Sequence, residues 1–468
     1  MKKVCVIGGG ISGLTAAFLL KNKGFDVALF EKSGAVGGNV ETVRVDGFLI
    51  EYAPNSLIKS PRLVDLIKAL KLEREVLTAN PTNKKRYVLR NGKLRALPMS
   101  IAKMAADGYF SAGAKMRLLR EPFVKSKSPD GESVAEFFER RLGREIVERA
   151  ADPFIAGIYA GNPENLSVKA AFPRLYELEK EYGSLLLGSL RSKSEKADKD
   201  FPRSFSFVNG IQTLTDKLGE SLGESVQTNT EILEIKKTAD GKISVLTKTV
   251  QEADEMSAFR QENIFDAVVI STPAESAANL IEHLDADLSA KLKDVYYPPV
   301  ALVYFGVKKE NVGFNLDGFG FLIPSSEKRK ILGTLCNSAV FENRAPDGYH
   351  LLTTFVGGAR NPEIFEQTDA ELFETVYAEL KSILNLRAKP DFMHVKRWRR
   401  AIPQYALGYE TVEKSIENFS AQHNGIFFCS NFYRGISVGD SVKNAYRTAD
   451  EIEELFSHEQ TRKNTKNV

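Results

Sequence analysis

Residues 3–13 read KVCVIGGGISG, and this stretch decides the first part of the fold. The apolar run over 3–7 suits a buried parallel strand, and Gly8, Gly10 and Gly13 follow it with the spacing GxGxxG. Apolar residues then recur at helical spacing up to residue 20, and a second apolar run over 27–30 ends at Glu31. The sequence therefore predicts a strand–helix–strand unit that binds a dinucleotide.

Each residue of this motif has a physical task. Gly8 allows a tight turn, Gly10 lets the backbone approach a pyrophosphate, and Gly13 lets the helix pack closely on the strand. The start of the helix offers free N–H groups and a partial positive charge to the phosphates. A carboxylate at Glu31 can accept hydrogen bonds from ribose hydroxyls and would repel a 2′-phosphate, so the motif favours FAD or NAD over NADP.

A glycine pair, Gly37-Gly38, begins six residues after Glu31 and precedes Asn39. Together with the first motif it resembles the flavin amine oxidase superfamily, and this resemblance implies FAD as the cofactor. The expected fold is α/β, with a Rossmann-like FAD-binding domain of the amine-oxidase type. The predicted cofactor contacts are Gly8, Gly10, Ile11, Ser12, Gly13, Glu31, Lys32, Gly37, Gly38, Asn39, Val226, Gly435, Val438 and Gly439.

Composition excludes several other classes of protein. The chain has 468 residues, of which 43% are hydrophobic and 27% charged, so it is expected to fold as a globular protein of two or three regions. A net charge of +3 is too small to suggest nucleic-acid binding. The three cysteines lack CxxC spacing and the five histidines are scattered, so we expect no metal site and assign no histidine to catalysis. No apolar run reaches 18 residues, and the start of the chain reads better as a strand than as an export signal.

The rest of the chain divides into recognisable segments. Asn91-Gly92 predicts a hairpin over 86–97, and the pattern over 98–190 is helical, with a capping box at Ser133 and one apolar face from Val134 to Ile146. A polar loop is expected over 191–199 and a strand over 226–232. Alternating apolar residues over 297–307, 318–335 and 351–356 indicate an antiparallel sheet, a helix is expected over 371–386, and a last helix from Ser441 leads to a polar tail.

Read as a whole, the chain resembles the protoporphyrinogen oxidase family, in its oxygen-dependent flavoprotein branch. The specific stretches are DPFIAGIYAGNP at 152–163, GFGFLIP at 318–324, LGTL at 332–335 and TTFVGG at 353–358. The resemblance implies a discontinuous FAD domain, a substrate domain on an antiparallel sheet, and a helical membrane-binding insertion. The expected bounds are 1–80, 206–290 and 405–456 for the FAD domain, 81–97 and 291–404 for the substrate domain, 98–205 for the helical domain, and 457–468 for a flexible tail.

The family's substrate is a porphyrinogen, which is oxidised in two-electron steps while O2 reoxidises the flavin. Carried onto matching positions, the resemblance makes Arg86 the cation for a propionate, places the backbone of Gly157 against the macrocycle, and sandwiches the ring between three side chains. Those side chains are Leu322, Leu335 and Phe355. On sequence alone, the two leucines are more often plain core; the alternatives for the other two residues are a surface cation at Arg86 and a simple turn at Gly157.

Two departures from the family pattern stand out: Asp440 follows the last glycine where a basic residue is frequent, and Ala53 stands where a glycine is frequent. The flavin site near the C-terminus is expected at Gly435, Val438 and Gly439. The departures put the local phosphate electrostatics and the approach of the backbone to the flavin in question.

Other functions remain open at this stage. A coproporphyrinogen III oxidase of the same family differs only in the number of propionates on its substrate, and an amine oxidase or carotenoid desaturase shares the fold. A non-catalytic flavoprotein that carries a tetrapyrrole is a third possibility. Apolar and basic residues interleave over 101–125, which suits either a peripheral contact with the inner face of the plasma membrane or the inside of a helical domain. The lack of an export signal predicts a cytoplasmic protein, and contact with ferrochelatase and a homodimer are further expectations.

Overall fold

A computed structural model describes residues 1–81, 85–98, 101–192, 201–249 and 259–466. The N-terminal stretch forms the predicted unit of strand β1 (Lys3–Ile7), helix α1 (Ile11–Asn22) and strand β2 (Asp26–Phe30). Strand β1 lies in the middle of a five-stranded sheet whose strands are all parallel, in the order β10-β2-β1-β14-β20. The other three strands are β10 (Val226–Gln227), β14 (Ala267–Ile270) and β20 (Ile426–Phe428).

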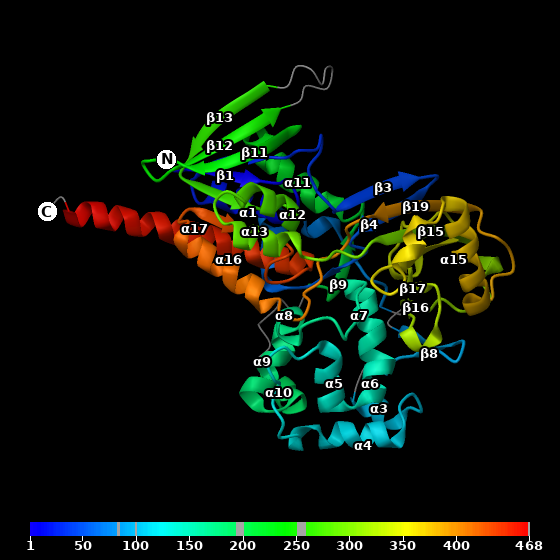
Figure 1. Ribbon diagram of the computed structural model, residues 1–468. Coiled ribbons are helices and arrows are strands. Elements are labelled where there is room, and N and C mark those ends of the chain that lie inside the picture. The colour runs from blue at the N-terminus through cyan, green and yellow to red at the C-terminus, as the bar shows by residue number, and fades with distance from the viewer. Residues whose placement is uncertain (82–84, 99–100, 193–200, 250–258, 467–468) are drawn as a thin grey trace.

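Smaller sheets and several helices surround this parallel sheet (Figure 1). Helix α1 packs against helices α11 and α17 on one side of the sheet, because its small and apolar residues are buried almost all round. The sheets are β11 (Thr230–Lys237), β12 (Ile243–Thr249) and β13 (Phe259–Phe265); β5 (Leu57–Ile58), β9 (Ser204–Phe207) and β6 (Val76–Thr78); and β3 (Glu41–Val45) with β4 (Phe48–Ala53). The helices are α2 (Pro61–Ala69), α11 (Gln212–Leu222), α12 (Ala274–Ile281), α13 (Ala286–Lys293), α16 (Glu410–Gln422) and α17 (Val438–Lys466).

A mainly antiparallel seven-stranded sheet forms the second layer, in the order β19-β15-β18-β17-β16-β7-β8. Helix α15 (Asp369–Leu384) covers one face, and strand β4 packs on the other, where the rings of Phe48 and Phe392 stack at 4.4 Å. The predicted hairpin turns at Asn91-Gly92, both with positive φ. The strands are β7 (Lys85–Arg90), β8 (Lys93–Ala96), β15 (Val300–Lys308), β16 (Gly318–Leu322), β17 (Ile331–Cys336), β18 (Tyr349–Gly357) and β19 (Phe392–Trp398).

A helical region extends away from both sheets, and helix α7 lies where it meets the seven-stranded sheet (Figure 1). The capping box is confirmed, because Ser133 and Glu136 exchange hydrogen bonds at the start of α5. The single helical face expected up to Ile146 is wrong, since Gly143 adopts φ 93° and ends α5 at Leu142. The helices are α3 (Ile101–Ala106), α4 (Ala112–Arg120), α5 (Val134–Leu142), α6 (Arg144–Ile146), α7 (Asp152–Tyr159), α8 (Val168–Ala171), α9 (Pro173–Tyr182), α10 (Leu185–Arg191) and, within the seven-stranded layer, α14 (Asn337–Val340).

Short helical turns connect these elements. A π-helical turn, η3 (Val147–Ala151), joins α6 to α7 and shifts the helical register directly before Asp152. The 3₁₀ turns are η1 (Glu73–Glu75), η2 (Glu121–Phe123), η4 (Gly223–Ser225), η6 (Lys309–Asn311), η7 (Ser325–Glu327) and η8 (Pro362–Glu366).

The structure differs from the sequence predictions at two further places. The strand expected over 226–232 divides into β10 and β11, because Asn229 adopts φ 52° and turns the chain from the parallel sheet into another one. The last helix begins at Val438, close to its expected start, but it continues to Lys466 across most of the expected tail, since no glycine or proline follows Gly439. Residues 193–199 of the expected loop lie outside the described residues, and the division into domains stays a prediction.

Candidate active site

One large cavity lies where the carboxyl ends of β1, β2 and β14 face the seven-stranded sheet and α7. Its volume is about 1070 Å³. The carboxyl edge of a parallel sheet is where α/β folds bind their ligands, so this cavity is the candidate active site. It has a nucleotide end, lined by the residues that follow β1 and β2, and a substrate end, lined by α7 and the seven-stranded sheet.

The glycines of the first motif take the places that the sequence predicts for them. Gly8 has φ 105°, a backbone conformation that favours glycine. A Cβ on Gly13 would lie 2.0 Å from the carbonyl oxygen of Gly8, so the helix and the strand approach as closely as they can. A Cβ on Gly10 would meet no atom within 4 Å, and Gly10 lines the cavity. The space above Gly10 is therefore available to a cofactor.

The N-terminus of α1 opens on this space. Gly10 is the N-cap residue, no side chain caps the helix, and its first turn contains no acidic residue. Ile11 and Ser12 line the cavity beside it. Uncapped N–H groups and the helix dipole favour an anion at this position, which suits a pyrophosphate.

Glu31 is held at the end of β2 by hydrogen bonds from the chain around it. Its carboxylate accepts from the N–H of Gly9 at 2.6 Å and from the N–H of Ser33 at 2.8 Å. The neighbouring Lys32 forms an ion pair with Glu231 at 3.2 Å, and all three charged residues line the nucleotide end. The carboxylate therefore lies where a ribose would be expected from the motif.

The second glycine pair and the start of α17 complete the nucleotide end. Gly37, Gly38 and Asn39 line the cavity, and the N–H of Gly37 donates to the carbonyl oxygen of Gly9 at 2.8 Å. Val438 and Gly439 line it from the other side. Close approach of these three backbone segments leaves room for a flat, extended ligand.

Three predicted cofactor residues do not line the cavity. Gly13 lies against the strand, as described above, and Val226 pairs with Leu29 in the sheet. Gly435 packs against Asp440, whose carboxylate accepts from the hydroxyl of Ser437 at 2.6 Å. This bond at the start of α17 gives Asp440 a local structural partner, which accounts for an acid at this position.

At the substrate end three of the five predicted residues line the cavity. Gly157, Leu335 and Phe355 line it, and the side chain of Leu322 lies against Gly157, 2.7 Å from where a Cβ would stand. Arg86 is exposed, and its guanidinium carbon lies 4.9 Å from the ring centroid of Phe319, which also lines the cavity. Contact of these residues with a substrate stays a prediction.

The sequence reasoning missed several lining residues. Tyr52 and Trp398 close the end of the cavity next to strand β15, and Trp398 donates from its indole N–H to the carbonyl oxygen of Tyr52 at 3.4 Å. Sequence reasoning missed Trp398 because the basic residues around it hide the alternation of apolar and polar residues that would have marked β19 as a strand. Ser271, after β14, also lines the cavity, and the end of that parallel strand was the available signal for it.

Charge is distributed unevenly along the cavity. Among the described residues that line it, the charged ones are Glu31, Lys32 and Glu231, all at the nucleotide end. The substrate end is lined mainly by apolar and aromatic side chains, and the described lining residues include no histidine. Such a site can hold a large apolar ring but offers no obvious base among the described residues.

The fold and this site define an FAD-dependent oxidoreductase of the amine-oxidase type. The residues present fit FAD because an uncapped helix N-terminus, a glycine with open space above it and a ribose-side carboxylate lie along one cavity. The family described as flavin containing amine oxidoreductase matches residues 11–453.

Comparison with known proteins narrows the class. Mitochondrial protoporphyrinogen oxidase from Nicotiana tabacum is 35% identical to the chain, covering 96% of it and 94% of that protein. Coproporphyrinogen III oxidase from Bacillus subtilis (strain 168) is 30% identical, covering 97% and 99%. A crystal structure from Exiguobacterium sp. 255-15 shares the fold, with a TM-score of 0.78 at 24% identity and coverage of 97% and 98%. The chain belongs to the protoporphyrinogen oxidase family.

Proposed function

We propose that this flavoenzyme oxidises protoporphyrinogen IX to protoporphyrin IX with O2. The observation that carries the proposal is the absence of charge at the substrate end, within the part of the chain that the structure describes. Protoporphyrinogen carries two propionates, which can lie together at the mouth near Arg86, and its other substituents are apolar. An apolar slot suits that half of the ring, since burying an unpaired carboxylate costs several kcal/mol.

The protein's task in this reaction is mainly to position the ring. FAD, when bound, supplies the chemistry that accepts a hydride, and each two-electron step reduces one O2 to H2O2. Gly157 lets the macrocycle approach the backbone of α7, because a side chain at this position would collide with Leu322 and force α7 or Leu322 to move. Leu335 and Phe355 exclude water from the ring faces. Protons released from the pyrrole nitrogens can leave through tautomers of the ring, so no dedicated base is required.

Oxidation of coproporphyrinogen III to coproporphyrin III is the second candidate. The Bacillus subtilis relative favours it, since the match covers 97% of this chain and 99% of that protein. Four propionates would place at least two carboxylates in the part of the cavity where the described lining has no cation. We therefore rank this substrate second.

A direct comparison of substrates tests the proposal. Purified yellow protein is mixed in air with each porphyrinogen separately, and porphyrin fluorescence and peroxide are followed against a no-enzyme control. We expect a higher kcat/KM for protoporphyrinogen. Preference for coproporphyrinogen would select the second candidate, and turnover of neither would remove porphyrinogen oxidation and return an amine or polyene substrate to consideration.

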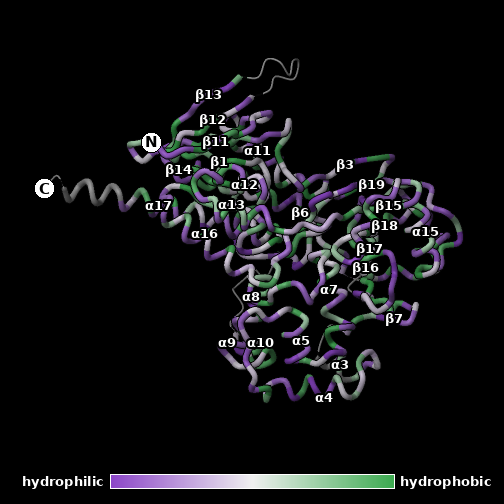
Figure 2. Tube along the Cα trace, in the orientation of Figure 1, coloured by the Kyte–Doolittle hydropathy of each residue, from purple (hydrophilic) through white to green (hydrophobic). Residues whose placement is uncertain are grey.

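We also propose that the protein is cytoplasmic and makes peripheral contact with a membrane through α4 and η2. Helix α4 forms the outer edge of the helical region, and apolar and polar residues interleave along it (Figure 2). Met116 is 50% exposed, Leu119 62% and Phe123 80%, next to the basic Arg117 and Arg120. An apolar edge with neighbouring cations suits an anionic lipid surface. By contrast, three residues of the same stretch are buried in the helical region: Tyr109, Phe110 and Leu118.

Co-sedimentation with anionic liposomes at low salt tests this contact. We expect the double variant Leu119→Ser, Phe123→Ser to stay in the supernatant, and Leu190→Ser, which changes an exposed leucine on α10, to bind like the wild type. Equal binding of all three proteins would remove this surface. No helix in the described part of the chain is long and apolar enough to cross a membrane. Contact with ferrochelatase and homodimer formation stay predictions.

A further inference from the structure

Three segments that carry predicted substrate residues meet at one ion pair behind the cavity wall. Asp152 is the first residue of α7, which carries Gly157, and its carboxylate accepts from the guanidinium of Arg360 at 2.9 Å. Its other oxygen accepts from the N–H of Ser325 at 2.7 Å, just beyond the end of β16. Neither Asp152 nor Arg360 lines the cavity.

Arg360 extends the same connection to the strands. A second nitrogen of its guanidinium donates to the carbonyl oxygen of Ile323 at 2.7 Å, and Ile323 directly follows Leu322. Arg360 itself follows β18, the strand of Phe355. The N–H of Ala359 donates to the carbonyl oxygen of Ala160 at 2.7 Å, immediately after α7. Both ends of α7 are therefore tied to the segment that follows β18.

The ion pair is shielded from water, so its bonds hold their geometry. The side chains of Arg360 and Asp152 are 12% and 8% exposed. Hydrogen bonds between charged partners are short and strong when desolvated, and a guanidinium can bond two acceptors in one plane. Lysine at this position would keep the charge but lose the planar fork.

The spacing between α7 and β16, which this pair joins, is narrow. The side chain of Leu322 already lies 2.7 Å from where a Cβ on Gly157 would stand. A shift of α7 relative to β16 by a fraction of an ångström would change the gap available to a flat ring between Gly157 and the opposite wall. Misplacement of about 1 Å in a site can cost two orders of magnitude in rate.

We propose that Asp152 and Arg360 are positioning residues that fix α7 against β16 and β18 and thereby set the width of the macrocycle slot. The inference rests on the proposed function, since the ligand expected to fit the slot is a porphyrin. The pair acts through Gly157 and Leu322 and makes no contact with the ligand itself.

The chain offers a matched control for the stability of this region. Arg329 forms an ion pair with Glu379 at 3.1 Å, and their side chains are 30% and 10% exposed. This pair ties the same β16–β17 connection to α15, and neither of its residues lines the cavity. Its loss should cost comparable stability but leave the slot unchanged.

The test compares Asp152→Asn and Arg360→Lys with Arg329→Gln in the full-length holoenzyme. FAD content and Tm are measured first, then binding of protoporphyrin IX by absorbance titration, and kcat and KM for protoporphyrinogen. We expect unchanged FAD content in all three. The Kd for the porphyrin and KM should rise about tenfold in Asp152→Asn and about threefold in Arg360→Lys, with little change in Arg329→Gln.

Each other outcome has a distinct meaning. Equal Kd and KM in Asp152→Asn and Arg329→Gln would overturn the inference while leaving the proposed function intact. A wild-type protein that neither oxidises nor binds porphyrins would overturn both. A wild type that binds the porphyrin without oxidising porphyrinogen would remove the proposed function, and the titrations would still decide whether the ion pair sets the slot.

Discussion

Two single glycines of the first motif serve different purposes, one in binding FAD and one in folding. Substitutions at each residue can separate the two. Gly10→Val places a side chain in open space, so the protein should fold and yet lose FAD. Gly13→Ala places a methyl group 2.0 Å from a backbone oxygen, so the helix must move. The free energy of unfolding should therefore fall by more than about 2 kcal/mol. Flavin absorbance per protein and the Tm of the flavin-free protein distinguish the two effects.

Gly24→Ala is a control for the loss of a glycine as such, because a Cβ there meets nothing within 4 Å and the residue lies far from the cavity. It should keep its full FAD content while the free energy of unfolding falls, because alanine is strained at its φ of 86°. Normal FAD content in Gly10→Val would contradict the placement of the pyrophosphate at α1.

Arg86 carries the second prediction at this scale. Arg86→Gln should leave FAD content unchanged and raise KM for protoporphyrinogen about fivefold, because a propionate at the mouth would lose a charged partner. Steady-state kinetics measures this effect, and raising the salt concentration should reduce the difference between variant and wild type. Arg387→Gln, an exposed arginine after α15, should match the wild type. An unchanged KM in Arg86→Gln would remove that residue from the site.

The sequence could predict the residues whose chemistry depends on local pattern. Gly8, Gly10 and Glu31 belong to one continuous motif whose spacing is set by the geometry of a single turn. Tyr52 and Trp398 reach the cavity only because β4 packs across β19, and that contact joins segments more than 300 residues apart. No local pattern encodes such a contact.

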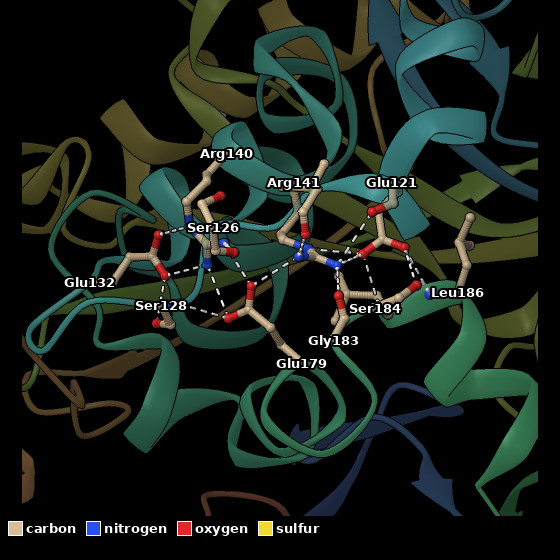
Figure 3. A network of polar contacts seen from close by, with 12 residues as sticks. Glu121, Ser126, Ser128, Glu132, Arg140, Arg141, Glu179, Gly183, Ser184 and Leu186 are labelled. Atoms are coloured by element: carbon tan, nitrogen blue, oxygen red, sulfur yellow. Dashed lines mark hydrogen bonds and ion pairs between the residues drawn. The ribbon is translucent and has the colours of Figure 1, made fainter.

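At the scale of elements, a buried polar network holds the helical region together (Figure 3). Glu121 on η2 pairs with Arg141 on α5, and it accepts from the hydroxyl of Ser184 and the N–H of Leu185 at the start of α10. Arg140 bridges Glu132 and Glu179, each at 2.6 Å. The network anchors η2, on which the exposed Phe123 stands.

Replacing Glu121 should therefore destabilise this region. Burial alone would raise the pKa of Glu121, but hydrogen bonds from Ser184, Leu185 and Arg141 outweigh it and hold the pKa below its usual value. Its contribution is thus fully present above the pKa of an unfolded glutamate, roughly 4.3, and is lost as pH falls through the lower folded-state pKa. Glu121→Gln should cost about 3 kcal/mol at pH 7 and make stability less sensitive to acid below pH about 4.

Thermal and urea unfolding between pH 3.5 and 7 check this prediction. Glu148→Gln is the control, because Glu148 pairs with Arg144 at 2.9 Å on the surface and such pairs contribute little. Should Glu121→Gln and Glu148→Gln unfold alike at pH 7, the network would have no special role in holding η2.

Element boundaries show where sequence patterns stop being sufficient. The apolar face over 134–146 is continuous in sequence, yet Gly143 ends α5 because its φ of 93° is not helical. The sequence over 226–232 has the pattern of one continuous strand, yet Asn229 at φ 52° directs its two halves to different sheets. Glycine and asparagine tolerate these conformations without requiring them, so only the packing of the neighbouring elements decides.

At the scale of the whole molecule, the cofactor site joins parts of the chain that are distant in sequence. Residues after β1, residues after β2 and the start of α17 all line the nucleotide end of one cavity, so bound FAD should stabilise the contacts among them at once. Free FAD at 100 times its Kd should add about 2.7 kcal/mol to the stability of the folded state. The Tm of flavin-free protein should therefore rise steadily with the logarithm of FAD concentration. The same titration on Gly10→Val should leave Tm unchanged, and a wild-type Tm independent of FAD would show that the cavity does not couple these segments.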